Sequence, residues 1–178
     1  MPSGDMPALL FTYGTLMLTT GIAAVDEAMR HAGVSLGRAY VRGHLYDLGD
    51  YPGAVAAGPI RNAAGKGSGL EDAADLGAGD GGAADEDDPK VWGHLLRLAD
   101  PDGLFAVLDP YEGFDAGNRA GSEFVRDRAD IIVAGSGVAY EAQIYWYNLP
   151  VSGRARIESG DYLAHWAAKG KPRQARIR

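Results

Sequence analysis

Two consecutive segments, Glu123–Val133 and Val138–Tyr147, are strong candidates for β-strands, and the second shows period-two alternation. The glycine-containing stretch 134–137 between them predicts a hairpin turn. In the second segment both faces are apolar or aromatic, because tyrosines alternate with Ile144 and Trp146. Such a strand must be covered on both sides, so we expect it to be a central strand or part of a barrel wall.

Three further stretches have strand character. Leu9–Leu16 is an apolar run that turns at Gly14, a residue that can adopt positive φ and lets a ligand approach the backbone closely. Residues 35–55 alternate and predict a strand, a turn and a second strand, and Lys90–Leu98 resumes the strand pattern.

Helical spacing predicts a short amphipathic helix beginning near Ile22, with Thr20 as N-cap and Gly33 as its stop. Its apolar stripe is typical of a helix that faces the core. A terminal helix is expected within Gly160–Ala167, packing through side chains that include Trp166.

A further helix is predicted to begin at Asp100-Pro101, with the aspartate as cap and the proline in the first position. Pro110 lacks the N–H that would continue it, so this helix should stop or kink near Leu108. Glu112 would then follow the helix on a tight bend beside Gly113.

The segment 62–89 differs sharply in composition from its surroundings. It holds seven glycines, seven alanines and eight acids against one base, so it accounts for the whole net charge of −7. A segment so poor in apolar bulk cannot offset the entropy of ordering it. We expect one domain over 1–178 that carries 62–89 as an acidic, solvated loop, an expanded hairpin loop between two strands. A role as an acidic segment that docks a partner is the less favoured alternative.

Composition excludes several functional classes. The chain has no cysteine, which removes disulfides, thiol catalysis and thiolate-bound metal. Outside the acidic segment the charges balance, so no broad basic face for nucleic acid is expected. No apolar run is long enough to span a membrane, and residues 1–7 lack the charge and apolar core of a secretory signal. We therefore expect a cytoplasmic protein.

The four histidines, at positions 31, 44, 94 and 165, show no spacing that would complete a metal site. Two candidates for chemistry remain. One is the turn Tyr13-Gly14-Thr15-Leu16, whose successive N–H groups can form an anion-binding concavity, although this stretch taken alone favours an ordinary turn after a strand. The other is the carboxylate Glu112 between Tyr111 and Gly113.

The order and spacing of five motifs resemble those of gamma-glutamylcyclotransferase-like proteins, which include gamma-glutamylamine cyclotransferases and avirulence-induced plant homologues. The motifs are Tyr13–Leu16, Gly43–Gly49 followed by Tyr51-Pro52, Leu108–Gly113, Glu123–Arg126 and Ala142–Tyr147. The resemblance spans residues 8–166 without the acidic segment. It implies an α+β fold, a small mixed β-barrel flanked by short α-helices.

The resemblance also implies a reaction without metal or organic cofactor. The α-amino group of a small γ-glutamyl amide or amine attacks its own γ-carbonyl, which gives 5-oxoproline and a free amine. Such an attack is intramolecular, so positioning supplies much of the acceleration. Glu112 would be the general acid and base, provided that burial raises its pKa towards neutrality from about 4.3.

Backbone N–H groups of Tyr13, Gly14, Thr15 and Leu16 would hold the substrate's α-carboxylate or the developing oxyanion. Tyr51 and Tyr147 would line the pocket, although a core or rim role is also open for each. Two alternatives remain: a non-catalytic module of the same fold that binds a γ-glutamyl or carboxylate ligand, and a biosynthetic enzyme that removes γ-glutamyl groups from a larger amine. The sequence leaves the amine half of the substrate and the oligomeric state open.

Overall fold

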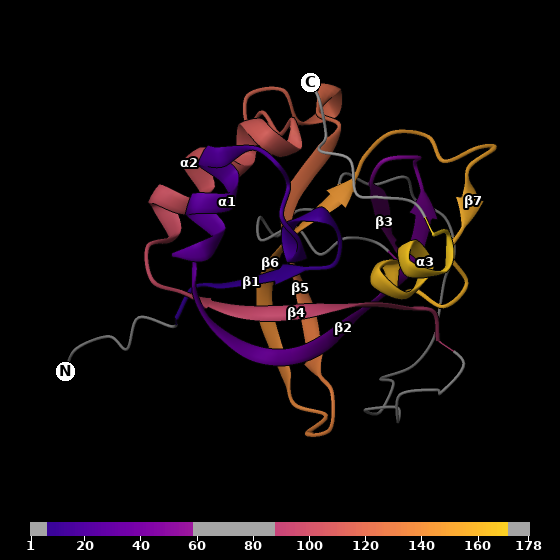
Figure 1. Cartoon of the computed structure of the whole chain (residues 1–178), viewed down its shortest axis with the longest axis horizontal. Helices are drawn as coiled ribbons and strands as arrows, with labels where there is room; N and C mark the ends of the chain where they lie inside the picture. The colour runs from indigo at the N-terminus through magenta and orange to yellow at the C-terminus, as the bar shows by residue number, and fades with distance from the viewer. Residues whose placement is uncertain (1–6, 59–87, 171–178) are drawn as a thin grey trace, which may run out of the picture.

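A computed structural model describes residues 7–58 and 88–170 (Figure 1). The strands are β1 (Leu9–Thr12), β2 (Gly33–Asp47), β3 (Pro52–Ala56), β4 (Lys90–Leu98), β5 (Phe124–Val133), β6 (Ala139–Tyr147) and β7 (Ala155–Arg156). The helices are α1 (Ala23–Arg30), α2 (Pro101–Glu112) and α3 (Tyr162–Ala168), with short 3₁₀ turns η1 (Thr15–Met17) and η2 (Arg119–Gly121). The expected acidic loop 62–89 lies outside the described residues except for its last two positions.

Five strands close into a mixed barrel in the order β2-β4-β1-β6-β5, and β5 returns to β2. Neighbours in this ring are antiparallel except β1 and β6, which run parallel. The predicted α+β fold with a small mixed barrel and short flanking helices is therefore confirmed. β3 and β7 pair with the far half of β2, beyond the ring.

The β5–β6 hairpin confirms the prediction made from its alternation. Ile144 and Trp146 of β6 point into the barrel, where they join an apolar core that includes Phe11 and Val91. Tyr145 faces a second core between the barrel and helices α1 and α2. In Figure 1 these two helices lie together on one side of the barrel, while α3 lies beside β3 and β7.

The prediction that 62–89 closes a hairpin is wrong. β3 and β4, the strands on either side of that segment, do not pair with each other. β4 pairs with residues 33–42 of β2, and β3 pairs with residues 43–47 of the same strand. Because β2 is fifteen residues long, it serves both partners at different places along its length.

The boundaries predicted for α1 are also wrong. The helix begins at Ala23 after an N-cap at Ile22, because Thr20 is bound elsewhere: its backbone N–H and its hydroxyl both donate to the Asp26 carboxylate, at 2.6 and 2.7 Å. Gly33 does not stop the helix but begins β2. Only glycine fits at this position. Its φ is 149°, and an added Cβ would lie 1.9 Å from the Arg97 carbonyl oxygen.

α2 begins as predicted, since the Asp100 side chain accepts a hydrogen bond from the Gly103 N–H at 3.1 Å and Pro101 fills the first helical position. The predicted stop near Leu108 is wrong, because the helix continues through Pro110 to Glu112. Pro110 removes the hydrogen bond that would reach back four residues to the Ala106 carbonyl. Both residues are exposed, so water can satisfy that carbonyl and the interruption costs little.

Candidate active site

Glu112 is the last residue of α2, not a residue beyond it. Gly113 ends the helix in the left-handed conformation, with φ 66° and ψ 35°, and the Phe114 N–H donates back to the Asp109 carbonyl at 2.9 Å. Only 6% of Glu112 is exposed, a low value for a carboxylate. The helix terminus thus holds this carboxyl group inside the protein.

The opposite wall comes from the turn that follows β1. After Thr12 the chain enters η1, in which the Met17 N–H donates to the Gly14 carbonyl at 3.0 Å. The N–H groups of Thr15 and Leu16 lie at the start of this turn and so have no acceptor within it. They are the donors that this segment can offer to a ligand.

Gly14 is required for a different reason from the one expected. Its φ is −135°, so positive φ is not used. An added Cβ would lie 2.7 Å from Cγ of Pro52, which is too close for any real contact. The absence of a side chain lets the turn pack directly against the start of β3.

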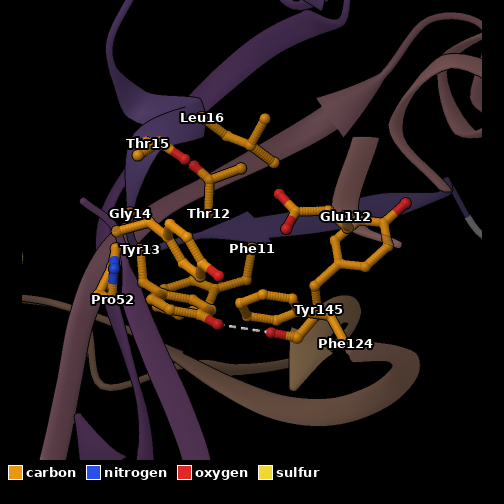
Figure 2. A pocket seen from close by; sticks show the side chains of 11 residues that line it. Phe11, Thr12, Tyr13, Gly14, Thr15, Leu16, Pro52, Glu112, Phe124 and Tyr145 are labelled. Carbon is orange, nitrogen blue, oxygen red and sulfur yellow. Dashed lines mark hydrogen bonds between the residues drawn. The ribbon is translucent and has the colours of Figure 1, made fainter. Parts of the chain in front are cut away.

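Glu112 and this turn face each other across a narrow pocket with a cavity volume of about 30 Å³ (Figure 2). Figure 2 shows the Glu112 carboxylate pointing towards Thr12 and Leu16. The lining residues are Phe11, Thr12, Tyr13, Gly14, Thr15, Leu16, Tyr51, Pro52, Glu112, Phe124 and Tyr145. Six of the seven residues proposed from sequence for catalysis or binding are therefore brought together.

The seventh, Tyr147, is not among the lining residues. Its ring packs edge-on against Phe124, with centroids 5.3 Å apart, and lies within 3 Å of the position a Cβ would take on Gly53. Tyr145 lines the pocket instead. The alternation of β6 puts both tyrosines on one face, so the sequence indicated the correct face but not which tyrosine reaches the cavity.

Glu112 is the only carboxylate among the lining residues, and no lysine, arginine or histidine accompanies it. The tyrosine hydroxyls around it are already engaged. Tyr13 donates to the Tyr145 carbonyl at 2.6 Å, and Tyr51 donates to the Glu123 carboxylate. Burial, together with the neighbouring Asp109 carboxylate, raises the pKa of Tyr145 well above its usual range. Glu112 is therefore the one acidic side chain, other than tyrosine, among the residues that line this pocket.

Within residues 7–58 and 88–170, no group of three or more His, Asp or Glu side chains is arranged to hold a metal ion. No helix in the described part of the chain is long and apolar enough to cross a membrane.

Three solved structures share the fold. An uncharacterised Pyrococcus horikoshii protein, PH0828, matches with a TM-score of 0.53 and 14% identity, over 92% of this chain and 96% of its own. The ytfP protein of Escherichia coli matches with a TM-score of 0.50 and 26% identity, over 88% and 97%. A protein of Arabidopsis thaliana matches with a TM-score of 0.50 and 15% identity, over 96% and 78%. No match to a curated protein was found.

The barrel is thus one that bacteria, archaea and plants share. The chain belongs to the family described as gamma-glutamyl cyclotransferase, AIG2-like, whose model matches residues 74–164. The matched half contains Glu112 and both strands of the β5–β6 hairpin. The turn after β1 lies outside the matched residues.

Proposed function

We propose that the protein is a gamma-glutamyl cyclotransferase that converts a γ-glutamyl amide or amine to 5-oxoproline and a free amine, with Glu112 as general acid and base. The observation that carries this proposal is the position of Glu112, a buried carboxyl group that faces the turn after β1 across the pocket. Membership of the gamma-glutamyl cyclotransferase, AIG2-like family supports the same reaction class.

The chemistry needs one group that moves a proton. The substrate's α-ammonium gives a proton to Glu112, and the freed nitrogen attacks the γ-carbonyl carbon to form the ring C–N bond. The bond to the amine then breaks, and the proton passes from Glu112 to the leaving nitrogen. Glu112 next takes the remaining extra proton of the ring nitrogen and passes it to the free amine, which departs as an ammonium ion. Burial disfavours the charged form of a carboxyl group, which suits Glu112 to both accepting and returning the proton.

The turn after β1 supplies the complementary role in this proposal. The N–H groups of Thr15 and Leu16 would hold the α-carboxylate or the oxyanion that develops on the γ-carbonyl oxygen. Tyr13 and Gly14 would shape the wall around them. Tyr51 and Tyr147 are proposed as ligand contacts. Tyr51 lines the pocket already. Tyr147 packs against Phe124 and would reach a ligand only after its side chain moves.

The narrowness of the pocket bears on how substrate enters. A volume of about 30 Å³ is comparable to that of one water molecule. A γ-glutamyl group needs more room than this, so in this proposal side chains of the lining shift when it binds. Tyr51 and Phe124 both line the pocket, with ring centroids 6.1 Å apart, and separation of this aromatic pair would widen it.

The test is a screen of γ-glutamyl dipeptides, γ-glutamyl amines and glutathione for release of 5-oxoproline, with Glu112→Gln as the matched control. We expect at least one compound to be converted. Glu112→Gln keeps the shape of the side chain but cannot exchange the proton, so kcat should fall by about 10²- to 10⁴-fold while thermal unfolding stays cooperative.

Full turnover by Glu112→Gln would contradict the proposed mechanism. Calorimetric binding of a γ-glutamyl compound without product after long incubation would instead identify a binding module of the same fold.

A further inference from the structure

Helix α2 is fastened to the barrel on both sides of Glu112. One residue after it, the Gly113 carbonyl accepts a hydrogen bond from the Glu123 N–H at 3.2 Å. Three residues before it, the Asp109 side chain reaches strands β5 and β6. Residues three apart share a helix face, so Asp109 lies beside Glu112 but is not among the residues that line the pocket.

The Asp109 carboxylate accepts three hydrogen bonds from the barrel. Arg126 of β5 donates from Nε at 2.8 Å and from Nη2 at 3.1 Å, and the Tyr145 hydroxyl of β6 donates at 2.6 Å. The Arg126 guanidinium lies 4.0 Å from the centroid of the Phe105 ring, which limits its movement. Bidentate pairing of this kind fixes an orientation as well as a distance.

Tyr145 continues this network around the pocket. Its hydroxyl is held by Asp109, its ring lines the pocket beside Glu112, and its carbonyl accepts a hydrogen bond from the Tyr13 hydroxyl. Tyr13 in turn accepts a hydrogen bond from the Ala54 N–H at 3.3 Å. Tyr145 therefore links the helix that carries Glu112, through its side-chain hydroxyl, to the turn on the opposite wall, through its backbone carbonyl.

We propose that Asp109 is a positioning residue, which fixes the end of α2 and the ring of Tyr145 so that Glu112 faces the turn after β1. The kinetic part of this inference rests on the proposed function. Asp109 does not touch the pocket, so its removal should affect the placement of Glu112 more than the binding of substrate.

The experiment compares four variants with the unmodified protein. Asp109→Asn loses the charge and weakens all three hydrogen bonds. Tyr145→Phe is the milder variant, since it removes one hydroxyl and keeps the ring. Glu141→Gln breaks a comparable pair with Arg128 (2.7 Å) that is exposed and outside the pocket lining, and Ile131→Val controls for a modest loss of stability in the barrel core.

Two readouts are measured for each variant. The first is kinetic. In Asp109→Asn, kcat should fall by about 10- to 100-fold while KM stays nearly unchanged. In Tyr145→Phe, kcat should fall by less, and in the two controls it should hardly change. The second needs no turnover. It is the ¹³C NMR signal of the Glu112 side-chain carboxyl carbon in protein labelled with ¹³C-glutamate, which is assigned because it disappears in Glu112→Gln. The chemical shift of this signal should change in Asp109→Asn and Tyr145→Phe only.

The two readouts separate the failure of each proposal. If no γ-glutamyl compound is converted by the unmodified protein, the proposed function fails, and the Glu112 signal alone decides the role of Asp109. A Glu112 signal that stays in place in both Asp109→Asn and Tyr145→Phe overturns the positioning role, whatever the activity. An equal loss of kcat in Ile131→Val would also overturn it, because the effect would then reflect stability.

Discussion

Gly14 illustrates how a single position can determine the shape of this pocket. It lies where the turn after β1 packs on the first residue of β3, and 2.7 Å separates Pro52 Cγ from the place of an added Cβ. A proline ring cannot swing aside as the end of a long side chain would. The backbone of the turn must therefore move if this position gains a side chain.

We expect Gly14→Ala to lower the free energy of unfolding by about 1–3 kcal/mol, the usual cost of overpacking. Turnover should fall by more than the loss of folded protein explains, because the displaced turn carries the Thr15 and Leu16 N–H groups. Urea unfolding and 5-oxoproline release measure the two effects. Gly58→Ala is the matched control, since nothing lies within 4 Å of its added Cβ. Unchanged stability in Gly14→Ala would contradict the close contact.

The site residues could be predicted from the sequence more readily than the residues that surround them in the fold. Glu112 and Tyr13–Leu16 could be singled out as a carboxylate beside a helix-ending glycine and a turn after a buried strand. Their meeting across one pocket depends on which strands pair, which no local pattern encodes. Asp109 belongs to the motif Leu108–Gly113, but nothing in the sequence distinguished it within that motif, because its partners Arg126 and Tyr145 are distant along the chain.

At the scale of the element, α2 continues past an internal proline, Pro110, but its end depends on the capping residue Gly113. Pro110 would end the helix early only if the Ala106 carbonyl, which loses its hydrogen-bond donor, had no other partner. Ala106 is exposed, so water can bind that carbonyl. The cap matters more, because Gly113 is the residue that turns the chain out of the helix directly after Glu112.

We expect Gly113→Ala to lower the free energy of unfolding by about 1 kcal/mol, the cost of holding an L side chain at φ 66°. Relaxation of the cap should also displace Glu112 and reduce kcat. Gly113→Asn is the comparison, because asparagine tolerates the left-handed region and should recover part of both losses. Equal behaviour of the two variants in thermal unfolding would argue against a conformational role for Gly113.

At the scale of the whole molecule, β2 organises the structure. Its first part closes the barrel with β4 and β5, and its last residues pair with β3 and β7. Alternation predicted the strands themselves, since 35–55 and 90–98 were expected as strands. It could not predict that β3 and β4 would share β2, because pairing depends on how a long strand curves rather than on which residues face inward.

The same strand also anchors the last helix. Asp47, at the end of β2, accepts hydrogen bonds from His165 Nε2 at 3.0 Å and from the Lys169 ammonium, both on the C-terminal side of α3. Tyr162, which is 2% exposed, packs the helix against the barrel core, and its hydroxyl donates to the Asp50 carbonyl. Docking of α3 therefore combines apolar burial with the Asp47 carboxylate and with the ion pair between Arg38 and the N-cap Asp161 at 2.9 Å.

Burial alone would raise the pKa of Asp47, but hydrogen bonds from Lys169, His165 and the Gly49 N–H outweigh it and lower the pKa to about 2. A carboxyl group whose pKa is lower when folded stabilises the protein above its unfolded pKa of about 4 and loses that contribution as the pH falls towards its folded pKa. We expect Asp47→Asn to reduce the free energy of unfolding by on the order of 1–2 kcal/mol at pH 7.

This difference between Asp47→Asn and the unmodified protein should shrink as the pH falls from about 4 to about 2, because Asp47 is increasingly protonated over this range and comes to resemble the uncharged asparagine. Urea unfolding at pH 7, 4, 3 and 2 measures it. Glu158→Gln, which breaks an exposed pair with Arg156 at 3.3 Å, is the control and should have little effect at any pH. A difference for Asp47→Asn that stays constant down to pH 2 would mean that the charge of Asp47 does not contribute to the stability of the fold.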